Sequence, residues 1–350
     1  MDKIYRILKS EYFLLFILAV INFFIAFYVI KLSLWHSDSE TYLNAARFLQ
    51  GEKLDAIPFN RLLSTPLMLY ASIGMSWFTG NFYSGMMAVN LIFYFLIIYV
   101  FFKLSLVIYN DRRVALFSAV LFLADYCFFS FGPSYLADLG GWFFFVLGSW
   151  LAVKYYREKN KKFYYLAIAA AGVGVLFKEY GALGLISLSL LIINMPYSWR
   201  KKFKEIVTAG FLFALIPVIY YLIFYIKFHY SYFDWYGLNI SAHGQSYGLI
   251  LILKDLIWLF SAGWPIFLYG IWQEKKYFER DKFKILTALL PASLAFLAWP
   301  ALTERIAFIF VVWLALIAGF GLSKVKNNYL AAAVVIFYII INYLVAFHLS

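Results

Sequence analysis

Residues 11–51 read EYFLLFILAVINFFIAFYVIKLSLWHSDSETYLNAARFLQG, an apolar run that passes directly into a segment with a histidine, an aspartate and a glutamate. A helix needs about 20 apolar residues to cross a hydrocarbon core about 30 Å thick. Such runs recur along the 350-residue chain, which is 65% hydrophobic and 14% charged, whereas about a quarter of the residues in soluble domains are charged. The sequence therefore predicts an all-α polytopic membrane protein.

The apolar runs predict about 11 transmembrane helices. Lys and Arg cluster in every second loop between the runs, so the positive-inside rule places the N-terminus in the cytoplasm and the C-terminus on the extracytoplasmic side of the cytoplasmic (inner) membrane. The net charge of +12 is thus a topology signal, and we expect no nucleic-acid partner. The approximate limits of the spans are 11–32, 82–104, 114–132, 139–154, 163–177, 181–196, 206–228, 252–272, 285–300, 305–322 and 328–348.

We expect a single domain over residues 1–350 and no soluble domain. Two outer loops are long, 33–81 and 229–251, and function is expected in such loops. The single Cys127 excludes an internal disulfide framework and a metal cluster built only from cysteines.

The first outer loop begins with a predicted amphipathic helix. Ser37 and Glu40 fit a capping box, and Gly51 supplies a stop. The apolar stripe of this helix consists of Tyr42, Ala45, Ala46 and Leu49. Two interpretations of Asp38 and Glu40 remain open: they favour the helix dipole only, or they guard a cavity.

Several charges fall below the predicted membrane surface. Lys178 lies 16 residues after Lys162, a helical rise of roughly 24 Å, so Lys178 and its neighbour Glu179 dip into the outer leaflet. Asp138 is slightly submerged by the same count, and Arg305 lies at the outer rim. A charge at such depth costs about 2.5–3.5 kcal/mol unless it is paired or faces a wet cavity. These charges either pair with their neighbours and hold helices together, or they line a site.

Asp125 lies deeper than the other acids and is predicted to be a hydrogen-bonded core residue. The remaining polar residues point to one outward-facing pocket: Asp38, Arg61, Asp138, Lys178 and Arg305. Acids beside cations suit a reaction between an anionic, lipid-embedded substrate and a hydroxyl or amine nucleophile.

These segments, taken in order, resemble the GT-C superfamily of integral-membrane glycosyltransferases, in particular its protein-mannosyltransferase and lipid A aminoarabinose-transferase branch. The resemblance covers about residues 10–325. The family's second segment has an arginine followed by paired prolines, and of these this sequence keeps only Arg61 and Pro66. The segments that carry it are SDSETYLNAARFLQG, NRLLSTPLMLY, SYLADLGGWFFF, GVLFKEYGALGLISL and TERIAFIFVVWLALIAGFGL.

The resemblance implies transfer of one sugar from a polyprenyl-phosphate donor to a lipid, glycan or protein acceptor on the extracytoplasmic face. It implies that Asp38 orients or deprotonates the acceptor, that Asp138 is a second catalytic acid, and that Lys178, Arg305 and Arg61 hold the donor phosphate. It also implies inversion at the sugar carbon and catalysis without a metal or another cofactor. Further substrate-binding candidates are His36, Glu40, Glu179, Tyr236 and His243.

The loop at 228–248 contributes Tyr236 and His243, whose segment either stacks on a sugar or prenyl chain or forms an interfacial aromatic belt. Two other functions remain open. A polymerase or ligase of polyprenyl-diphosphate glycans has a larger late outer loop than this chain. A lipid-linked sugar flippase or secondary transporter favours repeats and charges near the midplane, and only Asp125 fits that pattern.

Overall fold

The computed structural model describes residues 11–243, 249–276, 280–299 and 303–349, which contain helices and no strand. The helices of the first part are α2 (Glu11–Phe24), the π-helical turn η1 (Ile25–Val29), α3 (Ser39–Leu49), α4 (Phe59–Ser64), α5 (Pro66–Thr79), α6 (Phe82–Tyr109), α7 (Arg112–Leu123), α8 (Tyr126–Phe131), α9 (Asp138–Glu158), α10 (Lys161–Phe177) and the 3₁₀ turn η2 (Glu179–Ala182). Those of the second part are α11 (Leu183–Ile193), α12 (Trp199–Phe228), α13 (Tyr232–His243), α14 (Leu249–Phe260), α15 (Gly263–Lys276), α16 (Arg280–Ser293), the 3₁₀ turn η3 (Ala295–Ala298), α17 (Glu304–Ala307), α18 (Ile309–Ser323) and α19 (Asn328–Leu349).

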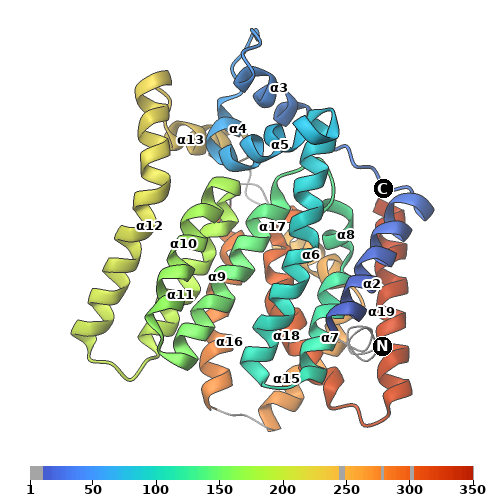
Figure 1. The fold of residues 1–350 in the computed structure, drawn as a ribbon. Helices are drawn as coiled ribbons and strands as arrows, with labels where there is room; N and C mark the ends of the chain where they lie inside the picture. Colours follow the sequence, from blue (N-terminus) through green and yellow to red (C-terminus); the bar gives the residue numbers. More distant parts are fainter. Residues whose placement is uncertain (1–10, 244–248, 277–279, 300–302, 350) are drawn as a thin grey trace, which may run out of the picture.

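The long helices form a bundle, and the short helices α3, α4, α5 and α13 gather at one of its ends, which we call the α3 end (Figure 1). The turns that join α9 to α10, α11 to α12 and α18 to α19 lie at the opposite end. The two long segments 33–81 and 229–251 were predicted to share one side of a membrane, and the first segment and residues 229–243 of the second lie at the same end of the bundle.

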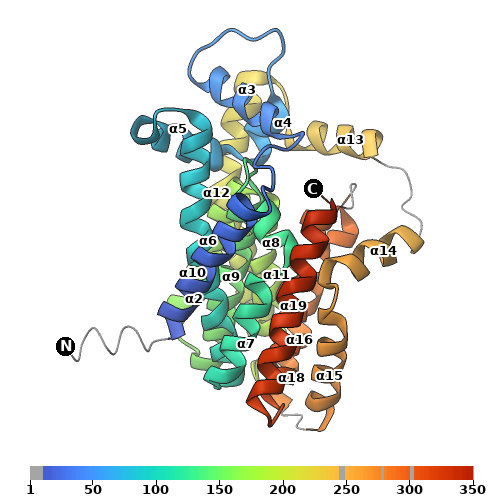
Figure 2. The ribbon, with the colours of Figure 1, turned by 90° about the vertical axis from the view of Figure 1, so that its right-hand side faces the viewer.

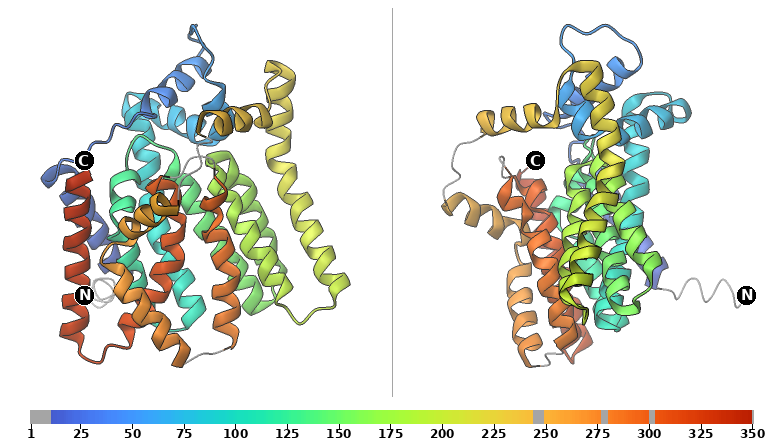
Figure 3. Two further views of the ribbon diagram at one scale, coloured as in Figure 1. Left: turned by 180° about the vertical axis from the view of Figure 1, so that it is seen from behind. Right: turned by 90° about the vertical axis from the view of Figure 1, so that its left-hand side faces the viewer.

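Helices α9 and α18 each pack against several neighbours in the bundle. Helix α9 packs against α6, α10 and α11, and α18 packs against α7 and α15. Aromatic side chains fill the space between them, as where the fully buried Trp142 lies 4.3 Å from Phe308 between ring centroids. Helix α12 lies at the edge of the bundle, where it packs mainly on α10 and α11 (Figure 3).

The predicted number of about 11 spans is not confirmed. Among the described residues, four helices are long and apolar enough to cross a bilayer: Glu11–Val29, Phe82–Tyr109, Trp199–Phe228 and Asn328–His348. A fifth span results if Ile252–Phe260 and Gly263–Lys275 count as one, although they meet at 85°. Figure 2 shows α14 lying across the bundle while α15 runs along it.

Helix breaks account for part of the difference. The predicted span 114–132 is divided into α7 and α8, because the Asp125 carboxylate accepts a hydrogen bond from the Cys127 backbone N–H at 3.0 Å and so caps a new helix. Tyr338 donates its hydroxyl to the other oxygen of Asp125 at 3.4 Å. Asp125 is thus the fully buried, hydrogen-bonded core acid that its depth predicts.

The hairpin between α10 and α11 is tight enough to bury its turn. A Cβ atom added at Gly181 would lie 2.2 Å from the carbonyl carbon of Gly174, so only glycines allow this approach. A Cβ at Gly141 of α9 would lie 2.6 Å from Cβ of Lys178. The turn residue Lys178 is therefore pressed against the first turn of α9, which begins at Asp138.

Candidate active site

Helix α3 holds Asp38 at its amino end. Asp38 occupies the N-cap position, but its side chain makes no capping hydrogen bond. The predicted capping box of Ser37 and Glu40 is therefore wrong, because the helix begins one residue later and the N-cap carboxylate is drawn to arginines instead. The predicted apolar stripe is the packing face of α3, since Tyr42, Ala45 and Ala46 are fully buried.

Four charged side chains from four segments form what we call the ion cluster: Asp38, Arg61, Asp138 and Arg305. Arg61 Nη2 lies 2.7 Å from Asp38 Oδ1, and Arg305 Nη2 lies 2.5 Å from Asp38 Oδ2. Arg305 also reaches Asp138, with 3.6 Å between Nη1 and Oδ2. Asp138 is 1% exposed, and its Oδ2 has no hydrogen-bond partner in the part of the chain that the structure describes. One guanidinium thus lies between two carboxylates.

Arg61 is fixed by the helix that carries its acid partner. Its Nε donates to Thr41 Oγ1 at 2.7 Å, and its guanidinium carbon lies 4.6 Å from the ring centroid of Tyr42. Thr41 and Tyr42 follow Asp38 by three and four positions, so all three face the same side of the first turn. Sequence reasoning did not identify Thr41 and Tyr42 as polar partners of this site, although their helical spacing from Asp38 was a usable signal.

A second charge pair lies beside the ion cluster. Lys178 Nζ is 3.7 Å from Glu179 Oε2, and both residues are 9% exposed. Neither carboxylate oxygen of Glu179 has a hydrogen-bond partner within the described residues. Lys178 also interacts electrostatically with Asp138 and Asp38. The pair is enclosed by protein, and its predicted depth in the membrane stays a prediction.

The ion cluster sets the protonation of its central acid. Burial by itself raises the pKa of the Asp38 carboxyl, but Arg61 and Arg305 outweigh this effect and lower the pKa to about 2. Asp38 is therefore a carboxylate at neutral pH. While both arginines hold it, it is also a weak base, because a low pKa means a low proton affinity.

The other predicted site residues form no ion pair with the cluster among the described residues. His36 has a buried Nε2 without a hydrogen-bond partner, whereas Glu40 is exposed on α3 and belongs to no ion pair among the described residues. Tyr236 of α13 lies 6.2 Å from Trp299 between ring centroids, and Trp299 lies 6.5 Å from Tyr180 beside Glu179. His243 ends α13, and its side chain lies outside the described residues.

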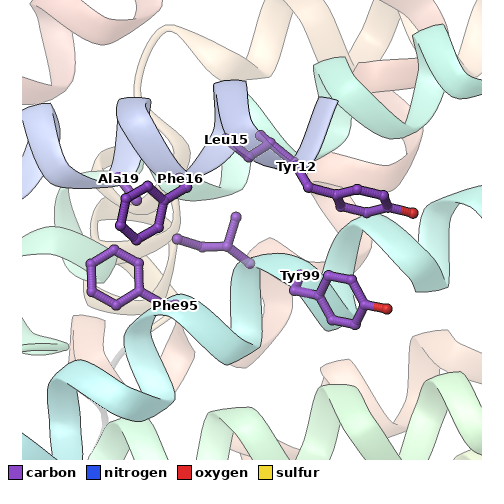
Figure 4. Close-up of a pocket in the computed structure, with 7 residues that line it drawn as sticks. Tyr12, Leu15, Phe16, Ala19, Phe95 and Tyr99 are labelled. Carbon is purple, nitrogen blue, oxygen red and sulfur yellow. The ribbon is translucent and has the colours of Figure 1, made fainter. Parts of the chain in front are cut away.

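A cavity of about 150 Å³ between α2 and α6 is separate from this site (Figure 4). Aliphatic and aromatic side chains line it, among them Phe16, Phe95 and Tyr99, and none of its described lining residues is Asp or Glu. No group of three His, Cys, Asp or Glu side chains within the described ranges could hold a metal ion.

A family model described as dolichyl-phosphate-mannose-protein mannosyltransferase matches residues 64–221. The fold resembles that of ArnT from Cupriavidus metallidurans bound to undecaprenyl phosphate, with a TM-score of 0.68, 15% identity, and coverage of 89% of this chain and 60% of that one. It also resembles the Archaeoglobus fulgidus oligosaccharyltransferase tethered to an acceptor peptide, with a TM-score of 0.60, 13% identity, and coverage of 98% and 55%. An AglB structure from the same organism, in complex with an inhibitory peptide and a dolichol-phosphate, has a TM-score of 0.59, 14% identity, and coverage of 95% and 55%.

The chain thus spans about 60% of the length of ArnT and 55% of the archaeal enzyme. The expected resemblance to the GT-C superfamily is confirmed in the family match and in the fold. The protein has the fold of a multi-pass GT-C membrane glycosyltransferase.

Proposed function

We propose that this GT-C-fold protein is a membrane glycosyltransferase that moves a single sugar from a polyprenyl-phosphate donor to an acceptor at the α3 end. Among the proteins of similar fold, ArnT is bound to undecaprenyl phosphate and AglB to a dolichol-phosphate, and one archaeal structure holds an acceptor peptide. These likenesses support a lipid-phosphate donor and a lipid, glycan or protein acceptor. The Lys and Arg pattern of the loops supports an extracytoplasmic α3 end in a cytoplasmic membrane.

The proposal rests most on Arg305, which lies between Asp38 and Asp138. Three cations are available for the donor phosphate: Arg61 and Arg305 in the ion cluster and Lys178 beside it. A guanidinium can donate two parallel hydrogen bonds to a phosphate as well as to a carboxylate, so Arg61 and Arg305 can bind a phosphate as they now bind Asp38. Fixed cations at a leaving phosphate stabilise the charge that develops as the bond breaks.

The reaction is a single displacement. An acceptor oxygen or nitrogen attacks the anomeric carbon while the bond from that carbon to the phosphate oxygen breaks. The electron pair of this bond leaves with the polyprenyl phosphate, and the acceptor proton passes to the Asp38 carboxylate. The configuration at the sugar carbon is inverted. Asp138, buried on the far side of Arg305, positions that guanidinium.

Donor binding activates the base in this scheme. Asp38 is a weak base while Arg61 and Arg305 both hold it. A phosphate that takes hydrogen bonds from these arginines weakens their hold on Asp38, so the proton affinity of the carboxylate rises only when donor is present. The same three cations neutralise the leaving group, a task that a divalent metal performs in other phosphoryl sites, and we propose catalysis without metal or another cofactor.

The direct test supplies radiolabelled polyprenyl-phosphate sugars to membranes that contain the wild type or Asp38→Asn. We expect transfer to fall by about 10²–10⁴-fold, the usual contribution of a general base. The matched control is Asp111→Asn at the opposite end, where Asp111 caps α7 by accepting from Arg113 and Val114 N–H groups. Asparagine caps a helix as well as aspartate does, so this control retains activity. Undiminished transfer by Asp38→Asn refutes the assignment.

A further inference from the structure

A cavity of about 360 Å³ lies next to the ion cluster and has no role in the scheme above. It lies between the segment that leads into α3, helix α8, helix α17 and the end of α19. The described residues that line it are Leu32, Ser33, Trp35, His36, Tyr126, Ser130, Phe131, Glu304 and Ala346. His36 connects it to the cluster, because His36 interacts electrostatically with Arg305, Asp138 and Asp38.

Three residues that line this cavity, His36, Tyr126 and Ser130, each carry a buried polar atom without a hydrogen-bond partner among the described residues: Nε2, the hydroxyl and Oγ, respectively. Buried polar atoms are normally hydrogen-bonded, so an unpartnered one needs an explanation. The three come from segments far apart in the chain and meet at one cavity. Their common position is explained if they bind a ligand with several hydrogen-bonding groups.

Two of these hydroxyls, those of Tyr126 and Ser130, are positioned by helix α8. Tyr126 and Ser130 are four residues apart on α8 and therefore share a face. Helix α8 exists as a separate element because Asp125 interrupts the longer apolar run and caps it. Asp125 is thus a positioning residue: by capping α8 it sets the orientation of Tyr126 and Ser130 at the cavity.

The charge of the cavity decides the kind of ligand. Glu304 contributes a carboxylate, and none of its described lining residues is Lys or Arg. A phosphate is repelled by such a wall, whereas hydroxyl groups can donate to the carboxylate and both donate to and accept from Tyr126 and Ser130. Burial and the nearby Arg305 lower the pKa of His36, so its ring is neutral at pH 7 and offers one donor and one acceptor nitrogen.

The volume and the lining of the cavity agree with a small ring-shaped ligand. Small-molecule pockets usually measure about 300–1,000 Å³, and this cavity lies at the lower end of that range. Trp35 and Phe131 provide apolar surface for the C–H face of a ring between the polar atoms. We infer that this cavity binds a sugar ring through its hydroxyl groups and holds it beside Asp38. The inference rests on the proposed function and adds the sugar subsite to it.

The sugar ring belongs either to the donor or to the acceptor, and binding experiments distinguish the two. The variant is Tyr126→Phe with Ser130→Ala, which removes two oxygens that have no hydrogen-bond partner among the described residues. Its probes are a polyprenyl phosphate without a sugar and the same lipid phosphate carrying one hexose, measured on detergent-solubilised protein. The matched controls are Tyr164→Phe at the start of α10 and Ser105→Ala on α6, both remote from the cavity.

A lost hydroxyl contact weakens binding by about 2- to 12-fold. If the cavity holds the donor sugar, the variant loses affinity for the hexose-bearing lipid and keeps its affinity for the bare lipid phosphate. If the cavity holds the acceptor sugar, the variant binds both lipids as the wild type does. In the transfer assay, the variant then needs more acceptor for half-maximal transfer. Equal loss for both lipids, or no change in any of the three measurements, overturns the inference. Transfer by the wild type is unaffected by either outcome, so the proposed function is tested separately.

Discussion

Arg305 Nη2 lies 2.5 Å from Asp38 Oδ2, although 267 positions separate the two residues. No local signal brings them together, and the contact exists because α17 and the first turn of α3 meet at the same end of the bundle. The second guanidinium nitrogen reaches Asp138 at 3.6 Å. Substitutions in the ion cluster are therefore expected to affect both the packing of the bundle end and the activity.

The two guanidinium nitrogens of Arg305 that reach Asp38 and Asp138 are predicted to contribute more to activity than the positive charge alone. Arg305→Lys keeps one positive charge but cannot reach both carboxylates. We expect kcat/KM to fall by about 10²–10³-fold, as when one fixed donor is removed from a transition-state site. The control is Arg157→Lys, since Arg157 pairs with Asp281 at 3.3 Å at the opposite end. An Arg305→Lys enzyme as active as this control contradicts the proposed role.

Acid dependence is predicted to differ between the free and the donor-bound enzyme. The folded pKa of Asp38, about 2, lies below the ordinary value of 3.8, so its ion pairs stabilise the protein above that value and are lost as the pH falls toward 2. The pH profile of kcat/KM for the donor reports the free enzyme, and that of kcat reports the complex. We expect the acidic limb of kcat to lie at higher pH. Identical limbs contradict the release of Asp38 by the donor.

Gly181 is predicted to hold Lys178 in place through the hairpin. In Gly181→Ala the new Cβ meets backbone atoms of Gly174, which cannot move aside, and we expect a loss of about 1–3 kcal/mol in stability. Thermal unfolding in detergent measures it. Gly210→Ala on α12 is the control, because a Cβ there meets nothing within 4 Å and alanine favours a helix over glycine. If both variants unfold alike, the close approach is not required.

Asp125 is predicted to act through structure alone. Asp125→Asn keeps an oxygen to accept from Cys127 N–H and should retain transfer activity, whereas Asp125→Ala loses the cap and about 0.5–2 kcal/mol of stability. A proton-coupled transporter that uses Asp125 as its carrier predicts the reverse for asparagine, namely complete loss. Parallel assays of transfer, and of lipid-linked sugar movement in vesicles, distinguish the two.

Part of the site could be predicted from the spacing of charged and apolar residues along the sequence. Counting residues from Lys162 predicted that Lys178 lies where a bare charge is costly, and Lys178 is buried by protein, with 9% of its surface exposed. The stripe on α3 predicted which face is buried. In both cases the cause is local, either the rise of a helix or its period, so the sequence carries the information directly.

Helix breaks were harder to predict. A continuous apolar run looks the same whether one helix crosses it or two helices meet within it, so neither the division at Asp125 nor the 85° bend between α14 and α15 was visible. Glu40 was grouped with Asp38 by proximity in sequence, but it is exposed on α3. Partners far apart in the chain, such as Arg305 and Asp38, depend on tertiary packing that no local pattern encodes.

The order in which the ribosome delivers these residues has a consequence for biogenesis. Asp38, Arg61 and Asp138 are synthesised well before α17, so if the amino-terminal half closed early, Asp138 would be buried without Arg305, its ion-pair partner in the described structure. A buried charge without its partner is strongly destabilising. Final closure of the amino-terminal half must therefore wait for α17, and messages truncated before it should yield polypeptides that quality-control proteases remove.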